Sequence, residues 1–531
     1  MADGVQRLEA PIAGTPNWFR AHFAGPSPQV ELAPASRLKD FVVDGHLELS
    51  LDDYLELVLE NSTDIAIQKL SIETPRNAIT RAFARFDPTV TTSFRATRNT
   101  SPTADELQGA DVLSTLTQPL SFDYGQALET GTSYTAGFST FRRSTNSAFA
   151  TVNPSIDATM DFSVTQPLLR NFGRRANRLQ IMIAKGRFDR SRFALQERLL
   201  DIIAQAETAY WAVIDARESL RVSEDALGLA DALLKRAERE LELGAISPLD
   251  IYQPQQSKAN SEIFVTQARF RLAQTLDALR RQMGADLDPD FQQMPVVLTE
   301  AVLPPEEEET VDPEKMVTVA MDRRPELRAI QTDLIIDDLS YDAARNLLKP
   351  NLSLTGFYSS QGLGGNTFIR SAGLPPAVIR GGVGDALRQV FEFNFPRYGF
   401  TLSLQLPVRD RRGVADMADA VLSKKEDMLA LRQTQQNLRL AVLNAVNQLE
   451  SSKARVKLAQ TSLEFSQKRL DAEQKKYDLG VTTIFFLLDA QNSLAEAEAE
   501  LVTQAAQYRR NYTQLLRVTG TLLDERGVVI Q

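Results

Sequence analysis

Residues 199–244 read LLDIIAQAETAYWAVIDARESLRVSEDALGLADALLKRAERELELG, and apolar residues recur there every seven positions. A second apolar or small residue follows each of them three positions later, which is the pattern of a coiled-coil helix. The two series are Leu199, Ala206, Val213, Leu220, Leu227, Leu234 and Leu241, and Ile202, Ala209, Ala216, Ser223, Ala230, Ala237 and Gly244. A continuous helix from Arg174 to Leu243 would be roughly 105 Å long at ~1.5 Å per residue, which no globular domain requires.

The second half of the chain repeats this pattern. Its series are Val442, Leu449, Val456, Leu463, Leu470 and Tyr477, with Ala445, Ser452, Ala459 and Ser466 three positions after the first four. Three residues of the first half also meet identical residues at a constant offset of 236: Gly244, Gln255 and Gly284 meet Gly480, Gln491 and Gly520. Each half is therefore predicted to run helix, strand, loop, strand, long helix, break, helix.

Helix-start signals stand near the beginning of each half. Ser50 with Asp53 is a capping pair, and Asp312 is followed by proline and glutamate, which suit the first turn of a helix. From these signals and the repeat we divide the chain into five parts. They are an N-terminal extension (1–47), a first repeat (48–284), a connector (285–312), a second repeat (313–525) and a C-terminal tail (526–531).

Strands are predicted where the apolar period changes to two. Residues 156–164 and 400–406 alternate strictly between apolar and polar, 352–355 alternates briefly, and 89–98 does so more weakly. The stretch 131–141 also alternates, but the sequence does not assign it a place. Four amphipathic strands per chain cannot close a membrane barrel of ~8 or more strands, whereas three chains with four strands each can. The strand count therefore predicts a trimer.

Composition narrows the possible functions. The 531 residues carry a formal charge of −10, which argues against nucleic acid as a partner. There is no cysteine, and the two histidines, His22 and His46, stand outside any motif, so enzyme and metal chemistry lack their usual groups. The sequence contains no run of about 18 apolar residues, so it predicts no membrane-spanning helix. A membrane barrel built from amphipathic strands remains possible. Residues 1–20 lack the pattern of a signal peptide, so we expect a mature or re-initiated chain.

Two helical halves, two strands inserted in each, and two similar helix breaks resemble the TolC-type outer-membrane efflux proteins. The resemblance covers about residues 47–525 and is most specific at 166–169, 241–256 and 477–491. It implies an α+β membrane protein: a trimeric 12-stranded outer-membrane β-barrel, four strands per chain, continuous with a long periplasmic coiled-coil α-barrel. The connector at 285–312 would then lie at the belt around the tunnel, although its acidic run is more simply a solvated linker.

The same resemblance implies the function. The protein would be the outer-membrane channel-tunnel of a tripartite efflux or type I secretion system. It would be a passive conduit for small molecules or proteins and not an enzyme. Its partners would be two further copies, a periplasmic adaptor protein, an inner-membrane pump and outer-membrane lipid, with no cofactor and no metal. The alternative is a structural coiled-coil scaffold without transport activity, which explains the heptads but leaves the alternating strands unexplained.

In this family the closed periplasmic end lies beside the helix breaks, here Gly244 and Gly480. Asp250 stands six residues after the first break, and Tyr477 stands three before the second. The resemblance implies that these two residues pair across neighbouring coils and hold the tip shut. It also implies that Asp489, nine residues after Gly480, contributes to an acidic ring around the pore.

Two positions depart from the family pattern. Thr482 stands where an arginine is expected, and Phe486 stands where an aspartate is expected, so an arginine-based lock and a double acidic ring are in doubt. Phe485 and Phe486 are candidates for a hydrophobic gate, a core contact or an adaptor contact. Each remaining residue has a plain alternative: Asp250 complements a helix N-terminus, Tyr477 continues the heptad, and Asp489 is a solvated acid.

Overall fold

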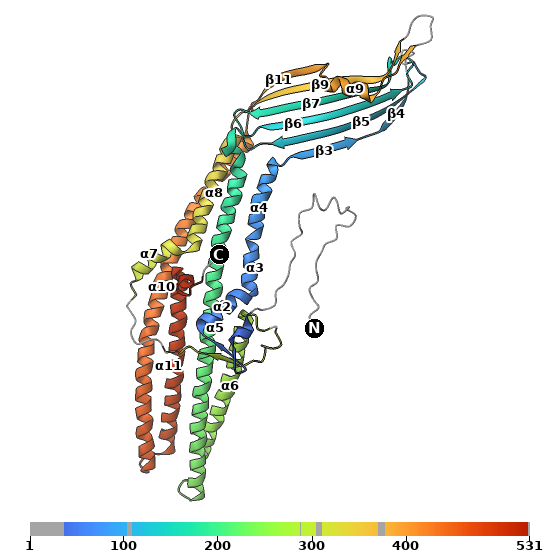
Figure 1. Ribbon diagram of the computed structural model, residues 1–531. Coiled ribbons are helices and arrows are strands. Elements are labelled where there is room, and N and C mark those ends of the chain that lie inside the picture. Colours follow the sequence, from blue (N-terminus) through green and yellow to red (C-terminus); the bar gives the residue numbers. More distant parts are fainter. Residues whose placement is uncertain (1–36, 104–108, 287, 304–310, 370–376, 529–531) are drawn as a thin grey trace. The chain divides into compact units, whose positions relative to one another are not determined.

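The computed structural model describes residues 37–103, 109–286, 288–303, 311–369 and 377–528, and Figure 1 shows its elements. The chain divides into two compact units, each drawn from both halves of the sequence. The first comprises residues up to 70, 194–325 and 434 onward, and the second comprises 71–193 and 326–433. The acidic run of the connector lies outside the described residues.

The first unit begins with a small sheet. A 3-10 turn, η1 (Leu38–Phe41), leads into β1 (Val42–Val43) and β2 (His46–Leu49). β2 pairs antiparallel with β1 and parallel with β8 (Val296–Leu298), which comes from the predicted connector. Helix α2 (Leu51–Asn61) follows at the predicted cap, where the Asp53 N–H donates to Ser50 Oγ at 3.2 Å and the Ser50 N–H donates to the Asp53 carboxylate at 3.2 Å. The capping prediction is confirmed.

Long helices make up most of the first unit. They are α5 (Gly173–Glu242) and α10 (Arg411–Asp478), whose first parts belong to the second unit, and α6 (Tyr252–Gln282) and α11 (Ile484–Thr519). Shorter helices are α3 (Thr63–Ser71), α7 (Pro313–Arg323) and α12 (Leu522–Glu525). Apart from the terminal Gly244, the predicted heptad positions are buried or half-buried, and Ala206 and Val442 are fully enclosed. Among the described residues, no helix combines the length and the apolar composition needed to cross a membrane.

Four glycines end long helices in the same way. Gly244, Gly284, Gly480 and Gly520 all have φ between +70° and +75°. The N–H of the following residue donates to a carbonyl five residues earlier in each case, as Ala245 to Glu240 at 2.7 Å and Val481 to Lys476 at 3.0 Å. This is the Schellman arrangement, in which a left-handed residue satisfies the last free carbonyls of a helix. The helix breaks predicted at Gly244 and Gly480 are therefore present.

The second unit contains one large sheet, with α4 (Glu73–Phe83), η2 (Ala84–Phe86), α8 (Pro325–Leu347) and α9 (Val383–Phe391). Its eight described strands are β3 (Thr89–Phe94), β4 (Thr97–Pro102), β5 (Val112–Ala127), β6 (Ser133–Thr145), β7 (Val152–Pro167), β9 (Asn351–Ile369), β10 (Ala377–Ile379) and β11 (Pro396–Gln405). β3 and β4 both pair with the same side of β5, and β10 and β11 both pair with β9. The strands thus occupy six positions, in the order β3/β4, β5, β6, β7, β9, β10/β11.

The prediction of four strands per chain is wrong. The alternating stretch at 131–141 belongs to β6, and it forms a hairpin with β5, which the sequence pattern did not reveal. The reason lies in the composition of β5. Its apolar residues Leu116, Leu120, Phe122 and Tyr124 share a face with Gln118 and Gln126, and Pro119 interrupts the other face. A period-two pattern broken in this way is too weak to recognise.

The two faces of the sheet differ in chemistry. Residues directly opposite in antiparallel strands project to the same side. By this register, one face carries Val90, Phe94, Leu116, Leu120, Phe122, Tyr124, Tyr134, Ala136, Phe138, Ile156, Ala158, Met160, Phe162, Val164, Leu352, Leu354, Tyr358, Phe400, Leu402 and Leu404. We call this the apolar face. The other face carries mainly Ser, Thr and Asp, and many side chains of the apolar face are exposed, as Phe400 is at 78%.

Helix α9, which lies between β10 and β11 in the sequence, packs on the apolar face of the sheet. Its Ala386 and Val390 contact Ile156 and Ala158 of β7. The approach requires glycine at 362, because a Cβ there would lie 2.1 Å from the Ala386 carbonyl. α9 also fills a gap in strand pairing, since neither β10 nor β11 reaches Leu363 of β9. The Gln389 amide replaces them, donating to the Leu363 carbonyl and accepting from its N–H, both at 3.0 Å.

Candidate functional site

The two helix breaks predicted from the sequence lie in the first unit and share packing. Leu233 of α5 clusters with Leu487 and Leu488 of α11, together with Tyr477 and Ile484. A second cluster joins Leu234, Ala237 and Ile251, again with Ile484 at its edge. Side chains from α5, α10, α11 and the turn before α6 therefore meet at one end of the helices, which we call the tip.

A network of four charged and polar side chains ties α5 to α10 at the tip. Arg236 of α5 pairs with Asp478 at 2.6 Å and with Glu240 at 2.8 Å. The Tyr477 hydroxyl donates to the other carboxylate oxygen of Glu240 at 2.8 Å. The Arg236 guanidinium also lies 4.6 Å from the centre of the Tyr477 ring, within the range of a cation–π contact. We call Arg236, Glu240, Tyr477 and Asp478 the tip network.

Electrostatics indicate that the tip network is charged and bonded at neutral pH. Burial raises the pKa of Tyr477 to about 12, and its bond to Glu240 acts in the same direction. Burial alone would raise the pKa of Glu240, but the hydrogen bonds from Arg236 and Tyr477 outweigh it and lower that pKa. The bond from Arg236 lowers the pKa of Asp478. Tyr477 thus remains a neutral donor to an ionised Glu240.

Asp250 is exposed and bonds within its own turn. Its carboxylate accepts from the Ser247 N–H at 3.2 Å, ahead of the start of α6 at Tyr252. The bonded N–H belongs to the turn and not to α6, whose N-cap residue Ile251 has no side-chain cap, so the helix-start alternative for Asp250 stays a prediction. Within one chain Asp250 and Tyr477 therefore have different partners, and a bond between them across two chains stays a prediction.

Asp489 is bound by an arginine. Arg469 of α10 forms an ion pair with the Asp489 carboxylate and donates to Ser493 Oγ at 3.1 Å, while Ser493 donates to the Asp489 carbonyl at 2.8 Å. Both charged side chains remain about half exposed. Part of the charge of the Asp489 carboxylate is therefore neutralised by its own chain, and its place in a ring around the pore stays a prediction.

The three remaining candidates surround the second break. Thr482 is half-buried in the turn between α10 and α11. Phe485 and Phe486 open α11, are about half exposed, and contact each other edge to face with ring centres 5.4 Å apart. They add to an exposed apolar surface around both breaks, which also includes Leu243, Leu249, Tyr252, Leu479 and Val481.

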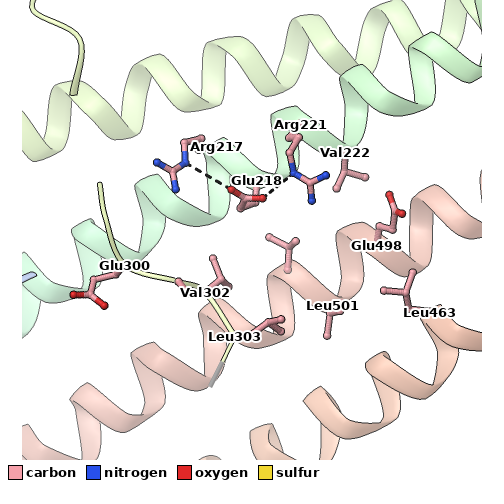
Figure 2. A pocket seen from close by; sticks show the side chains of 12 residues that line it. Arg217, Glu218, Arg221, Val222, Glu300, Val302, Leu303, Leu463, Glu498 and Leu501 are labelled. Atoms are coloured by element: carbon pink, nitrogen blue, oxygen red, sulfur yellow. Dashed lines mark hydrogen bonds and ion pairs between the residues drawn. The ribbon is translucent and has the colours of Figure 1, made fainter. Parts of the chain in front are cut away.

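A second candidate site is a groove of about 370 Å³ lined by α5, α10, α11 and residues 300–303 (Figure 2). Both of its arginines already have partners: Arg221 bonds to Glu218 at 2.9 Å, and Arg217 donates to the Leu298 carbonyl at 3.1 Å. The carboxylates of Glu300 and Glu498 and apolar residues such as Leu463 and Leu501 line the rest of the groove. In the described part of the chain, no three His, Asp or Glu residues are grouped to hold a metal ion.

Sequence reasoning missed Arg236, Glu240, Asp478 and Arg469. The spacing of Arg236 and Glu240 is a recognisable i,i+4 pair, but it does not show that a residue about 240 positions away joins it. Arg469 and Asp489 are 20 positions apart, on opposite sides of a helix break. Their contact follows from how α10 and α11 pack, which heptad spacing alone does not determine.

Comparison with known proteins identifies the family. The sequence profile of the outer membrane efflux protein family matches residues 131–285 and 317–521. The chain belongs to this family. Protein CyaE of Bordetella pertussis is 24% identical over 357 residues, covering 66% of this chain and 69% of that protein. The family consists of channel proteins, and membership confirms the predicted class, the outer-membrane location and the periplasmic helical domain.

Solved structures of outer-membrane proteins have the same fold as this outer membrane efflux protein. A membrane protein from Pseudomonas aeruginosa superimposes with a TM-score of 0.63 at 18% identity, covering 93% of this chain and 98% of its own. The CmeC outer membrane channel of Campylobacter jejuni gives 0.62 at 15% identity, covering 94% of each chain. At such identities the similarity establishes the fold alone.

Proposed function

We propose that three copies of this chain form a passive channel that carries solutes from the periplasm to the cell exterior. The observation that carries the proposal is the exposed apolar face of the sheet, joined in one chain to heptad helices of 70 and 68 residues. An apolar face of this extent needs lipid or another protein to cover it. The scaffold alternative leaves that face uncovered.

The tip is proposed as the periplasmic aperture. Breaks at Gly244 and Gly480 bring polar and apolar side chains to one end of the helices, and three copies would arrange Asp489 around a common axis. Because Arg469 pairs with Asp489, the ring would attract cations less strongly than bare carboxylates do. The pairing of Asp250 with Tyr477 between neighbouring chains is kept as a proposal, since Asp250 is exposed and reachable.

The exposed apolar side chains at the tip support an adaptor-binding role. Leu243, Leu479 and Val481 are more than two-thirds exposed, next to the breaks. We propose that a periplasmic adaptor covers them and connects the channel to an inner-membrane pump, in a tripartite efflux or a type I secretion system. The pump then selects the cargo.

The test of the proposal is the mass and solubility of the full-length protein. We expect it to require detergent and to sediment as a trimer with mixed helix and strand content. A detergent-free, monodisperse monomer would favour the scaffold alternative and contradict the channel. The same sample, placed in planar lipid bilayers, should give discrete conductance steps.

A further inference from the structure

The extra hairpin of the sheet lies in the first repeat only. That repeat contributes four strand positions, β3/β4, β5, β6 and β7, whereas the second contributes two, β9 and β10/β11. The second repeat therefore keeps the two strands that the internal repeat predicts, and β5 and β6 are additional. An added pair brings one strand in each direction, so the sheet still alternates from its first position to its last.

The hairpin is part of the sheet wall and is hydrogen-bonded on both sides. β5 pairs with β6 from Thr115 to Ala127, and β6 pairs with β7 from Ser133 to Arg143. Its alternation is also in phase with its neighbours: Phe122 lies opposite Phe138, and Phe138 lies opposite Met160, all on the apolar face. A hairpin that formed a plug or an external loop would need neither continuous hydrogen bonding to the sheet nor apolar residues aligned with those of the neighbouring strands.

The two edge strands of the sheet are compatible in direction and in the face that carries their apolar side chains. Every pair along the six positions is antiparallel, so β3/β4 and β11 run in opposite directions. Neither edge is paired among the described residues, and nearly all residues of β3 and β11 are exposed. Val90 and Phe94 on one edge and Phe400 and Leu402 on the other lie on the same apolar face. A second copy could therefore extend the sheet without breaking either the hydrogen-bond pattern or the face.

We propose that this chain builds a barrel of roughly 18 strand positions in the outer membrane, in place of the 12 implied by the family resemblance. The proposal rests on the trimer of the proposed function, with six positions from each chain. Because barrel diameter grows roughly linearly with strand number, the opening is about one and a half times as wide as that of a 12-stranded barrel. A barrel of that size leaves an aqueous channel, so the membrane end admits bulkier solutes and size selection falls to the tip.

Electron cryo-microscopy of the detergent-extracted full-length protein tests the barrel directly, because strands can be counted in cross-section. We expect three chains and about 18 strands, because each chain supplies six strand positions. Three chains around a 12-stranded barrel would overturn the inference and leave the channel proposal intact. A particle that is not a trimer, or that has no barrel, would overturn the proposed function as well.

Engineered cysteines give a second test, since the natural chain has none. Ser139 and Thr159 lie opposite each other in β6 and β7, so Ser139→Cys with Thr159→Cys should form a disulfide in the trimer. The matched control is Ser139→Cys with Gln361→Cys. These positions are in the same row but have β7 between them, about 9 to 10 Å apart at the usual strand spacing, which is too far for a disulfide.

The two cysteine pairs decide whether the hairpin belongs to the wall. A disulfide in the first pair and none in the control agrees with β5 and β6 as wall strands. No disulfide in a folded trimer of the first pair overturns the inference. Deleting residues 112–145 should reduce the count to about 12 strands while the trimer is kept, because the deletion removes one strand in each direction. A deleted trimer that keeps the wild-type count also overturns the inference.

Discussion

Asp489 shows how one neighbour changes the expected role of a residue. The family resemblance implies an acidic pore residue at this position, but Arg469 pairs with it. Replacing Arg469 with alanine should expose the carboxylate and raise the cation preference of the channel several-fold, whereas Asp489→Asn should lower it. The measurement is the reversal potential across a planar bilayer with a salt gradient.

The control for this pair is Lys468→Ala, one residue from Arg469. Lys468 bonds to Glu464 at 2.6 Å and not to Asp489, so its loss should leave the reversal potential close to that of the wild type. If neither Arg469→Ala nor Asp489→Asn changes ion selectivity in a channel that still conducts, the constriction lies elsewhere, and the exposed Phe485 and Phe486 become the better gate candidates.

Asp337 of α8 gives a pH-dependent prediction. Burial, then a hydrogen bond with Asp427 and the nearby charges of Asp333 and Asp338, raise its pKa to about 6. An unfolded aspartate titrates near 3.8, so between these values the folded state binds the proton more tightly. Stability contributed by this group is therefore highest below about pH 4, falls as the pH rises to about 6, and stays reduced above it.

Replacing Asp337 with asparagine should raise the melting temperature at pH 7.5 and change it little near pH 4, where the wild-type carboxyl is protonated. Asp342→Asn is the matched control on the same helix, because Asp342 pairs with Arg175 at 2.6 Å and is not among the charges that raise the pKa of Asp337. Thermal melting of the detergent-solubilised protein at the two pH values measures both variants. An equal gain at both values would mean that ionisation of Asp337 is not the cause.

At the scale of elements, the glycine breaks can be tested against a glycine inside the same helix. Gly244 has φ of +70°, and Gly228 lies in the interior of α5; neither would bring an added Cβ within 4 Å of another atom. Gly244→Ala should destabilise the protein by about 1–2 kcal/mol, because a left-handed conformation is costly for alanine. Gly228→Ala should stabilise it by roughly 0.5–1 kcal/mol, since alanine is the better helix former. Chemical denaturation in detergent compares them, and two changes of the same sign would contradict the assigned break.

Elements with a strong local signal could be predicted from the sequence. The heptads of α5 and α10, the Ser50 cap and the terminal glycines each depend on residues within a few positions of one another. Strands β7 and β11 were predictable for the same reason, since their alternation is unbroken. β5 was not, because its apolar face contains glutamines and its polar face a proline. Helix α9 depends on a close approach to Gly362, which no local pattern shows.

The sequence predicted the two helix breaks but not the contacts around them. The breaks locate the tip, and Tyr477, Asp489, Phe485 and Phe486 lie there. The partners could not be foreseen, because Glu240 reaches Tyr477 from 237 residues away in the sequence. Such contacts depend on the rotation of two long helices about their axes. A heptad pattern gives the buried stripe of each helix, but not which charged residues meet beside it.

At the scale of the whole molecule, we propose that the tip network holds the conduit closed. Arg236 contacts the other three members of the network, so Arg236→Ala should free α10 from α5 at this end. Arg239→Ala is the matched control, because this exposed arginine bonds to the carbonyl of Lys235 on its own helix. Acidification below the ordinary pKa of Glu240 should act in the same direction as Arg236→Ala, since a lowered pKa means that stability is lost as the pH falls.

Single-channel conductance of the purified trimer in planar lipid bilayers tests most directly whether this chain forms a channel that the tip network closes. We predict discrete steps for the wild type, several-fold larger steps for Arg236→Ala, and wild-type steps for Arg239→Ala. A correctly folded trimer that inserts into the bilayer and passes no current, with or without Arg236, would show that this chain does not form a channel.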